Sequence, residues 1–194
     1  MQEAQTPPTQ HLRHFLRGWL RDPRGMGAVA PSGRALARLM ATGVHRDATV
    51  LELGAGTGTL TEGLLASGVQ PANLYVVERD PELVAVLRPR FGGCHVIEAD
   101  ALAVQRELPA GITFDFVISG LPLLLFTPEQ RRELLGEILE LLRPNGCYHQ
   151  FTYGGRCPID RETRRRLGVD TRLLGIAALN LPPAFVYRLT RAPV

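Results

Sequence analysis

The sequence has few of the residues that disulfide-bonded, metal-binding and membrane-spanning proteins use. Its three cysteines are odd in number and lack the spacing of a metal site, so we expect reduced thiols in a cytoplasmic protein, with no disulfide framework and no metal. The first ten residues contain no apolar stretch, so we expect neither a signal peptide nor a transmembrane start. Lysine is absent, and the formal net charge of +3 therefore comes from arginine.

The remaining composition is that of one globular domain. A chain of 194 residues, of which 45% are hydrophobic, is long enough to bury a sizeable core. It shows no repeat, low-complexity tract or boundary between two globular domains. We divide it into residues 1–30, a loose tail followed by an amphipathic helix, and residues 31–194, the folded domain.

A glycine-rich loop after the first predicted strand organises this domain. The apolar run Val50–Leu53 predicts a short buried strand, and Gly54, Gly56 and Gly58 follow it at alternate positions. Glycine lets the backbone bend tightly and approach a ligand without a Cβ in the way. The helix predicted to begin near Thr57 would direct its free N–H groups at that ligand. Glycine runs also close ordinary strand-to-helix loops, so the loop alone does not decide the ligand.

Two acidic residues at the ends of the next predicted strands indicate that the ligand contains a nucleoside. Glu78 lies twenty positions after Gly58 at the end of a predicted strand, where its carboxylate can accept both ribose hydroxyls. A dinucleotide site would carry its third glycine at Thr59, so S-adenosylmethionine fits better than NAD. Asp100 either accepts a hydrogen bond from an adenine amino group or is a solvated loop carboxylate.

Strand-like and helix-like segments alternate along the chain, which is typical of an α/β fold. The predicted strands are 50–53, 73–78, 94–97, 113–118, 147–153, 173–179 and 184–189. Helices are predicted to begin at Pro31, near Thr57, at Pro81 and after Thr127, and Arg143–Gly146 is predicted to be a turn. Because ligands bind beyond the carboxyl ends of the strands in such sheets, the segments after the first four strands should converge.

A segment near the start of the chain has the pattern of an amphipathic helix that ends at Asp22-Pro23. Its apolar residues recur at the spacing of one helix face, with arginine at every fourth position beside them. That combination suits the headgroup region of an anionic bilayer, although the apolar face could instead pack on the domain. The residues assigned to membrane or lipid binding are Leu12, Arg13, Phe15, Leu16, Arg17, Trp19, Leu20, Arg21 and Arg34.

The glycine loop, Glu78, Asp100 and the alternating pattern together resemble the class I S-adenosylmethionine-dependent methyltransferases. This resemblance implies a Rossmann-like α/β fold, with a seven-stranded, mostly parallel sheet and helices on both faces. Within that superfamily the sequence resembles the bacterial phospholipid N-methyltransferases, which convert phosphatidylethanolamine to phosphatidylcholine. The segments that carry the second resemblance span nearly the whole chain: 15–19, 27–33, 119–123, 150–153 and 180–184.

Carried over by position, the resemblance implies that Glu52 and the loop glycines hold the methionine part of the cofactor, Glu78 the ribose and Asp100 the adenine. Ala55 stands where proline is common in the family. The full set of implied cofactor residues is Ser32, Glu52, Gly54, Gly56, Thr57, Gly58, Thr59, Glu78, Arg79, Asp100, Ala101 and Ser119. Ser32 could equally be a simple helix cap.

The acceptor site is assigned to four residues. We expect Ser119 and the Leu121 carbonyl to lie beside the amine, and the rings of Tyr153 and Tyr187 to face the methylated cation. Each tyrosine could instead be a half-buried strand residue. No histidine or isolated carboxylate in these motifs identifies itself as a general base.

The resemblance implies S-adenosylmethionine-dependent N-methylation of phosphatidylethanolamine and its mono- and dimethyl derivatives at a membrane surface. The expected partners are an anionic membrane and an aminophospholipid, without nucleic acid or metal. The protein is expected to be a monomer, peripherally associated with the inner face of the bacterial cytoplasmic membrane. Because the chemistry demands only a primary amine on a lipid, another aminolipid such as ornithine lipid is the alternative acceptor.

Two further alternatives are open. The layout is similar to that of the ribosomal RNA adenine dimethylases, but Gly120 and Leu123 stand where those enzymes carry the amide and the aromatic ring of an Asn-Leu-Pro-Tyr segment. The other is a membrane-bound protein that keeps the cofactor fold without turnover. The arginine run at 161–166 is either a solvated face or a contact for phosphates or lipid headgroups.

Overall fold

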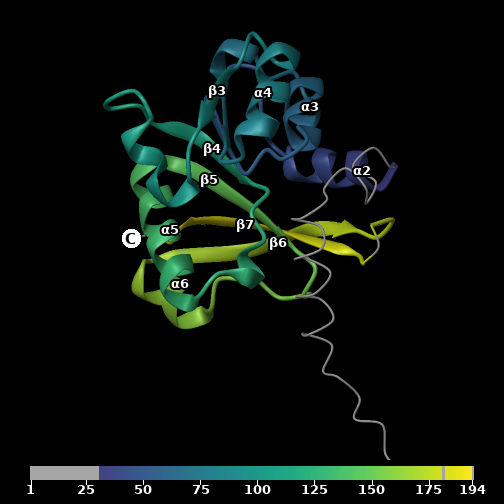
Figure 1. The fold of residues 1–194 in the computed structure, drawn as a ribbon. Coiled ribbons are helices and arrows are strands. Elements are labelled where there is room, and N and C mark those ends of the chain that lie inside the picture. Colours follow the sequence, from purple (N-terminus) through teal and green to yellow (C-terminus); the bar gives the residue numbers. More distant parts are fainter. Residues whose placement is uncertain (1–30, 181, 194) are drawn as a thin grey trace, which may run out of the picture.

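The computed structural model, which describes residues 31–180 and 182–193, contains a seven-stranded sheet with helices on both faces (Figure 1). The strand order is β3-β2-β1-β4-β5-β7-β6. Strands β1 to β5 run parallel to one another, whereas β7 is antiparallel to both β5 and β6. The Rossmann-like α/β fold that the resemblance implies is therefore confirmed.

The elements alternate along the chain as predicted. The strands are β1 (Val50–Leu53), β2 (Leu74–Glu78), β3 (His95–Glu98), β4 (Phe114–Ser119), β5 (Leu142–Thr152), β6 (Val169–Ala177) and β7 (Ala184–Arg191). The α-helices are α2 (Pro31–Met40), α3 (Thr59–Ala66), α4 (Pro81–Arg90), α5 (Pro128–Leu141) and α6 (Arg161–Arg166). Three short 3-10 helices lie between them: η1 (Pro71–Asn73), η2 (Ala101–Arg106) and η3 (Leu123–Leu125).

Two helix starts are fixed by side-chain caps. The Asp80 carboxylate accepts hydrogen bonds from the backbone N–H groups of Glu82 and Leu83 at the start of α4. Thr127 and Gln130 form a capping box at the start of α5, where each side chain bonds the other residue's backbone N–H. These caps hold the loops that precede both helices in defined positions.

Two apolar clusters pack on opposite faces of the sheet. Successive residues of β1 alternate between them, because strand side chains point to opposite faces: Val50 joins the cluster under α2 and α3, and Leu51 the cluster under α5. Leu64 of α3 and Leu134 of α5 are among the buried helix residues. All four residues of β1 are buried, so the central strand is covered on both faces.

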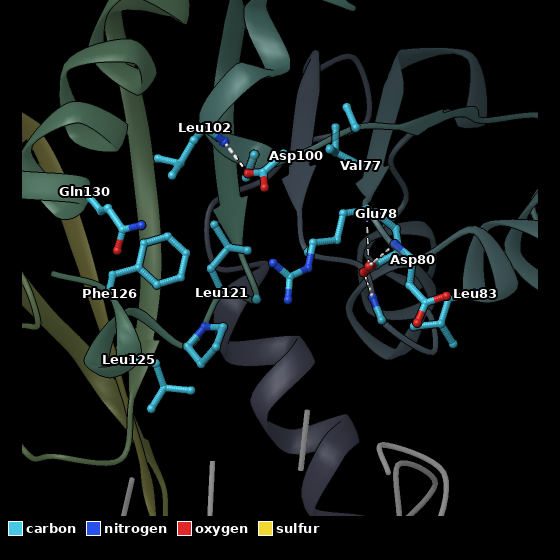
Figure 2. Close-up of a pocket in the computed structure, with 17 residues that line it drawn as sticks. Val77, Glu78, Asp80, Leu83, Asp100, Leu102, Leu121, Leu125, Phe126 and Gln130 are labelled. Carbon is cyan, nitrogen blue, oxygen red and sulfur yellow. Dashed lines mark hydrogen bonds between the residues drawn. The ribbon is translucent and has the colours of Figure 1, made fainter. Parts of the chain in front are cut away.

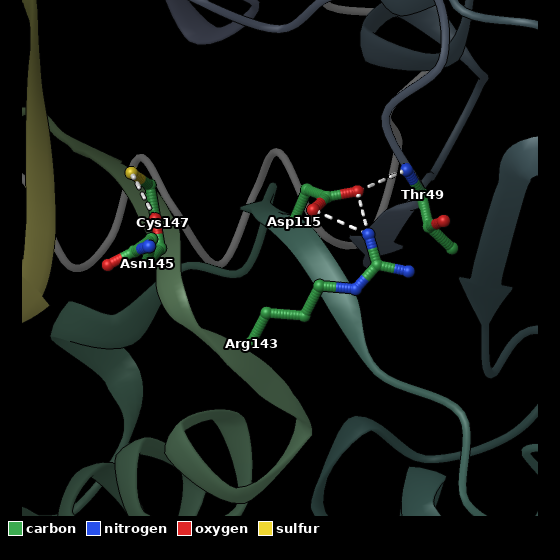
Figure 3. Close-up of polar contacts among 5 residues, drawn as sticks. All are labelled: Thr49, Asp115, Arg143, Asn145 and Cys147. Carbon is green, nitrogen blue, oxygen red and sulfur yellow. Dashed lines mark hydrogen bonds and ion pairs between the residues drawn. The ribbon is translucent and has the colours of Figure 1, made fainter.

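The residues of the predicted turn, Arg143–Gly146, lie within β5 but have no register partner on β4, which pairs with Leu142 and then with Cys147. The register between β4 and β5 shifts near the start of β4, and the additional β5 residues form an irregular stretch within the pairing. The Asp115 carboxylate lies between two partners there (Figure 3). It accepts hydrogen bonds from the Arg143 guanidinium at 2.6 Å and from the Thr49 backbone N–H at 2.8 Å.

The last two strands are longer than predicted. β6 begins at Val169 and β7 continues to Arg191, because the antiparallel pairing extends to the Val169–Arg191 pair. The two strands form a hairpin that extends past the end of β5 (Figure 1).

The predicted amphipathic helix at 12–21 and the rest of residues 1–30 lie outside the described residues. In the part of the chain that is described, no helix is long and apolar enough to cross a membrane. Within residues 31–180 and 182–193, no three histidine, cysteine, aspartate or glutamate side chains are grouped so that they could hold a metal ion.

Candidate functional site

A cavity of about 370 Å³ opens beyond the carboxyl ends of β1, β2, β3 and β4, as Figure 2 shows. Its lining residues are Gly54 and Gly56 after β1, Val77–Asp80, Ala99–Leu102 and Gly120–Pro122 after the next strands, and Leu83, Leu125, Phe126 and Gln130. Glu78, Asp80 and Leu83 face Phe126 and Gln130 across it. The predicted convergence of the four strand-end segments is confirmed, and the volume suits a small organic ligand.

The three loop glycines have different surroundings, although all take positive φ angles that other residues rarely adopt: 72° at Gly54, 56° at Gly56 and 84° at Gly58. A Cβ at Gly54 would lie 2.8 Å from Leu121, and one at Gly58 would lie 2.6 Å from the Phe91 ring. A Cβ at Gly56 would meet no atom within 4 Å. Gly56 therefore presents bare backbone to open space at the cavity wall. Gly58 does not line the cavity and serves the packing against Phe91.

Exchanging these glycines for alanine should separate the two roles. Gly56→Ala is expected to cost about 1 kcal/mol of unfolding free energy through its positive φ, and to weaken S-adenosylmethionine binding because its methyl group would occupy the open space. Gly58→Ala should cost about 3 kcal/mol, since the ring contact adds to the backbone strain. Urea unfolding and calorimetric titration would measure both, and unchanged cofactor affinity in Gly56→Ala would show that no ligand approaches this backbone.

The Glu78 carboxylate is held by three backbone donors at the cavity wall. One oxygen accepts a hydrogen bond from the Gly56 N–H at 2.8 Å, and the other accepts from Arg79 and Asp80 at 2.9 and 3.0 Å (Figure 2). A carboxylate has about four acceptor sites, so capacity remains for a ribose hydroxyl. The position of Glu78 is therefore compatible with the predicted ribose contact.

Asp100 and Ala101 also line the cavity. One Asp100 oxygen accepts a hydrogen bond from the Leu102 N–H at 2.9 Å, which fixes the start of η2. The carboxylate is exposed and retains its second oxygen for a ligand. The adenine contact proposed for Asp100 is thus sterically open, with the Leu102 and Phe126 side chains nearby as apolar walls of the same cavity.

Glu52 does not line the cavity, although the resemblance places it at the methionine part of the cofactor. Its side chain is fully buried, and one oxygen accepts a hydrogen bond from the Thr61 hydroxyl at 2.7 Å. The other oxygen has no hydrogen-bond partner among the described residues. Burial raises the pKa of this carboxyl from its usual 4.5 to about 7. Thr57 and Thr59, whose hydroxyl oxygens lie 3.5 Å apart, also stay outside the cavity lining.

A buried chain of hydrogen bonds supports the segment after β4. The Ser119 hydroxyl is fully buried and accepts from the Leu121 N–H at 3.2 Å, so it holds the backbone and does not itself line the cavity. The Leu121 carbonyl accepts from the Gln150 side-chain amide at 2.9 Å, and the Gln150 oxygen accepts from the Tyr148 hydroxyl. Gln150 was given no role from the sequence. It begins the segment 150–153 that carries the phospholipid N-methyltransferase resemblance, which was the available signal.

Tyr153 and Tyr187 do not line the cavity and pack against different apolar clusters. Tyr153 lines a small adjoining pocket that shares Leu121 and Pro122 with the cavity wall. The Tyr153 ring stands edge-on to Phe151, with ring centroids 5.5 Å apart, and burial raises the pKa of its phenol while a hydrogen bond with Asn180 lowers it. The Tyr187 hydroxyl donates to the Gly155 carbonyl at 3.0 Å. Their contact with a methylated cation stays a prediction.

The residues proposed for lipid contact are only partly described. Arg34 is exposed on α2, whereas the Ser32 side chain and residues 12–21 lie outside the described set. The arginine run of 161–166 forms α6, which precedes the start of β6 and so lies away from the hairpin end that follows Ala177 (Figure 1). Arg166 pairs with Glu162 there.

Residues 50–146, half of the chain, match the family model described as a methyltransferase domain. The chain belongs to the class I S-adenosylmethionine-dependent methyltransferases. The methyltransferase is 33% identical over 181 residues to an ornithine lipid N-methyltransferase of Singulisphaera acidiphila, an alignment that covers 89% of this chain and 92% of that protein. It is 36% identical over 135 residues to a ribosomal RNA small subunit methyltransferase A of a Synechococcus species, but spans only 44% of that protein's length.

The fold is shared with solved methyltransferases. The 1,6-didemethyltoxoflavin N1-methyltransferase of Burkholderia thailandensis, solved with S-adenosylhomocysteine bound, aligns with a TM-score of 0.68 at 19% identity over 100% of this chain and 94% of that one. The cofactor of the methyltransferase is S-adenosylmethionine. Bare backbone at Gly56, the fixed carboxylate of Glu78 and the exposed Asp100 are compatible with holding it.

Proposed function

We propose that the methyltransferase N-methylates the free primary amine of an aminolipid, with ornithine lipid as the acceptor. The observation that carries the proposal is the similarity to the Singulisphaera acidiphila ornithine lipid N-methyltransferase, which extends over nearly the whole length of both chains. The phospholipid N-methyltransferase resemblance names phosphatidylethanolamine, but both lipids present a primary amine. The full-length similarity favours the ornithine lipid. To reach such a lipid, the enzyme would bind peripherally to the inner face of the cytoplasmic membrane.

The chemistry asks the chain to bind and align two reactants. S-adenosylmethionine supplies an electrophilic methyl group when bound, and the acceptor must present a neutral amine in line with it. Orientation of this kind can lower the activation free energy by several kcal/mol, and by roughly 7 or more in favourable cases. The Leu121 carbonyl already accepts from the Gln150 side-chain amide and from the Leu123 N–H, each at 2.9 Å, so both of its lone pairs are used and the predicted contact with the amine would have to displace one of them. Gln150 thus holds the orientation of that carbonyl.

The segment after β4 favours a lipid over an RNA base. In the ribosomal RNA dimethylase resemblance, a side-chain amide occupies the position of Gly120. Here a Cβ at Gly120 would lie 2.5 Å from the Gly54 carbonyl oxygen, so an asparagine does not fit without movement of the glycine loop. Leu123, at the position of the stacking ring, is buried at 2% exposure and offers no platform.

A comparison of acceptors tests this proposal. The purified full chain would be incubated with labelled S-adenosylmethionine and mixed micelles of ornithine lipid, phosphatidylethanolamine or its mono- and dimethyl forms, with matched acyl chains, and with ribosomal RNA. We expect a kcat/KM for ornithine lipid about tenfold or more above that for phosphatidylethanolamine, and no label in RNA. A preference for phosphatidylethanolamine would replace the acceptor, and label in RNA alone would overturn the lipid proposal.

A further inference from the structure

The end of the β6–β7 hairpin is an apolar surface without an assigned role. Residues 173–187 contain no charged side chain. Four large apolar side chains are exposed among residues 31–180 and 182–193, and three of them lie on this hairpin: Leu173 at 44%, Ile176 at 50% and Leu179 at 73%. We call these three residues the hairpin patch. Apolar side chains grouped in this way on a surface commonly mark an interaction site.

Positive charge lies where the uncharged hairpin end begins, on the opposite face of the strands from Leu173 and Ile176, whose register partners are Tyr187 and Phe185. Arg172 and Arg188 are register partners on β6 and β7, so they mark one level of the hairpin with only uncharged residues beyond them. Arg172 is exposed, whereas Arg188 is half-buried and donates to the His149 ring nitrogen at 3.2 Å. The nearest acidic residue along β6 is Asp170, which lies on the far side of Arg172 from the hairpin end.

Helix α2 adds further arginines beside the hairpin. A Cβ at Gly175 of β6 would lie 3.0 Å from Leu39, so α2 packs closely against this strand. Arg34 and Arg38 are exposed on α2. An apolar tip bordered by arginine is the arrangement of a surface that places its apolar part among acyl chains and its cations among anionic headgroups.

The hairpin end lies at the same edge of the sheet as the cavity. Parallel strands β1, β4 and β5 all end at that edge, and Thr152 at the end of β5 pairs with Phe185 near the start of β7. The connection between β6 and β7 is therefore at the carboxyl edge, where Gly54 and Gly120 line the cavity. Figure 1 shows the hairpin extending outward beyond β5.

We infer that the hairpin patch inserts into an anionic lipid bilayer and turns the cavity edge of the methyltransferase toward the membrane. This inference rests on the proposed aminolipid acceptor and adds a second membrane contact to the predicted N-terminal helix. Leu173, Ile176 and Leu179 enter the acyl region, and the exposed arginines Arg34 and Arg172 contact the headgroups. The lipid amine then reaches the site from the surface on which the enzyme is bound.

Vesicle binding by a double variant tests the inference. Full-length protein carrying Ile176→Ser and Leu179→Ser would be compared with wild type by flotation with vesicles of phosphatidylglycerol and phosphatidylcholine. Val86→Ser is the matched control, because Val86 is exposed to a similar 46% but lies on α4. We expect about a tenfold or greater fall in vesicle affinity for the double variant, and wild-type affinity for the control. Equal binding of the double variant and wild type would overturn the inference.

A tryptophan reporter gives a second measurement. Trp19 is the only tryptophan of the sequence, so Leu179→Trp in a Trp19→Phe background reports on the hairpin alone. Its emission should shift to the blue and be quenched by brominated lipids when anionic vesicles are added. An unchanged spectrum would contradict insertion. The oligomeric state is measured by light scattering. A dimer in wild type and a monomer in the Ile176→Ser, Leu179→Ser variant would assign the hairpin patch to contact with a second copy of the chain instead.

Turnover on a short-chain, water-soluble ornithine lipid separates this inference from the proposed function. The serine variant should methylate it within about twofold of wild type, because neither residue lines the cavity. If wild type methylates the soluble lipid and the serine variant binds vesicles normally, the membrane role of the hairpin fails alone. If wild type methylates no lipid, the proposed function fails. Membrane insertion of the hairpin is then decided separately: it fails if the serine variant binds vesicles like wild type and the emission of the Leu179→Trp variant is unchanged by vesicles.

Discussion

Replacing Glu78 with glutamine is expected to weaken S-adenosylmethionine binding by about 100-fold. The Glu78 oxygens accept from three backbone N–H groups, those of Gly56, Arg79 and Asp80. In glutamine one oxygen becomes an NH₂ group, which would face a donor with another donor and would no longer accept from a ribose hydroxyl. The loss of affinity thus has two causes: the glycine loop is disturbed, and the hydrogen bond to the ribose hydroxyl is missing.

Glu98→Gln is the matched control for this variant. Glu98 is the register partner of Glu78 on β3, carries the same side chain and is exposed, but does not line the cavity. Isothermal titration with S-adenosylmethionine should give wild-type affinity for Glu98→Gln. Equal affinities for both variants would mean that Glu78 holds the loop without contacting the cofactor, and the ribose assignment would be wrong.

Removing either of two buried titratable groups is expected to expose opposite dependences of stability on pH. Burial raises the pKa of Glu52 from 4.5 to about 7 and lowers that of His149 from 6.5 to about 4. His149 is fully buried, with one ring nitrogen bonded to the Met40 carbonyl at 2.8 Å and the other accepting from Arg188. This pattern is that of a neutral imidazole.

The two groups change stability in opposite directions as pH changes. Between pH 4.5 and about 7, Glu52 ionises in the unfolded chain but stays protonated in the folded one. Its contribution to the free energy of unfolding therefore falls as pH rises. Between pH 6.5 and about 4, His149 takes up a proton only in the unfolded chain, so its contribution falls as pH drops. Each full shift corresponds to about 3 kcal/mol, and in wild type the two contributions oppose each other from pH 4.5 to 6.5.

Urea unfolding across this pH range would separate them. Relative to wild type, Glu52→Gln should lose stability by about 2 kcal/mol as pH falls from 6.5 to 4.5, because the titration of His149 is then no longer opposed by that of Glu52. His149→Gln, which can keep one donor and one acceptor, should lose a similar amount as pH rises over that interval. Glu107→Gln, at an exposed carboxylate, is the control. Parallel profiles for all variants would contradict the burial effect at both sites.

The parts of the site that are local in sequence could be predicted. Gly54 and Gly56 follow the apolar strand that ends at Leu53, Glu78 ends the next strand, and Asp100 follows the third. Strand-end convergence alone therefore brings them to one cavity. Gly58 is different. A side chain there would collide with the Phe91 ring at the end of α4, and no local sequence pattern specifies that contact.

The acceptor residues could not be placed without the register of β5 and β7. Gln150 pairs with Tyr187, so those two side chains share one face of the sheet, whereas Tyr153, one residue past the end of β5, packs against the apolar cluster of the other face. The predicted turn at Arg143–Gly146 is a local feature of the sequence. A Pro-Asn-Gly sequence favours a turn, and these four residues have no register partner on β4, although they lie within β5.

The acceptor itself depended on similarity and not on spacing. The resemblance seen in segments such as 119–123 pointed to lipid N-methylation, and the full-length relative shifts the favoured acceptor from phosphatidylethanolamine to ornithine lipid. Within the described residues, the structure contributes two reasons to expect a lipid: the crowded position of Gly120, and the hairpin patch at the cavity edge.

Mass spectrometry of the reaction product shows which lipid receives the methyl group. Purified methyltransferase would receive S-adenosylmethionine with a deuterated methyl group and vesicles that contain ornithine lipid, phosphatidylethanolamine and phosphatidylglycerol together. We predict labelled methyl groups on the terminal nitrogen of the ornithine headgroup, with the other lipids unlabelled or labelled far more slowly. Label confined to phosphatidylethanolamine, or no labelled lipid while the enzyme binds S-adenosylmethionine and vesicles, would contradict the account.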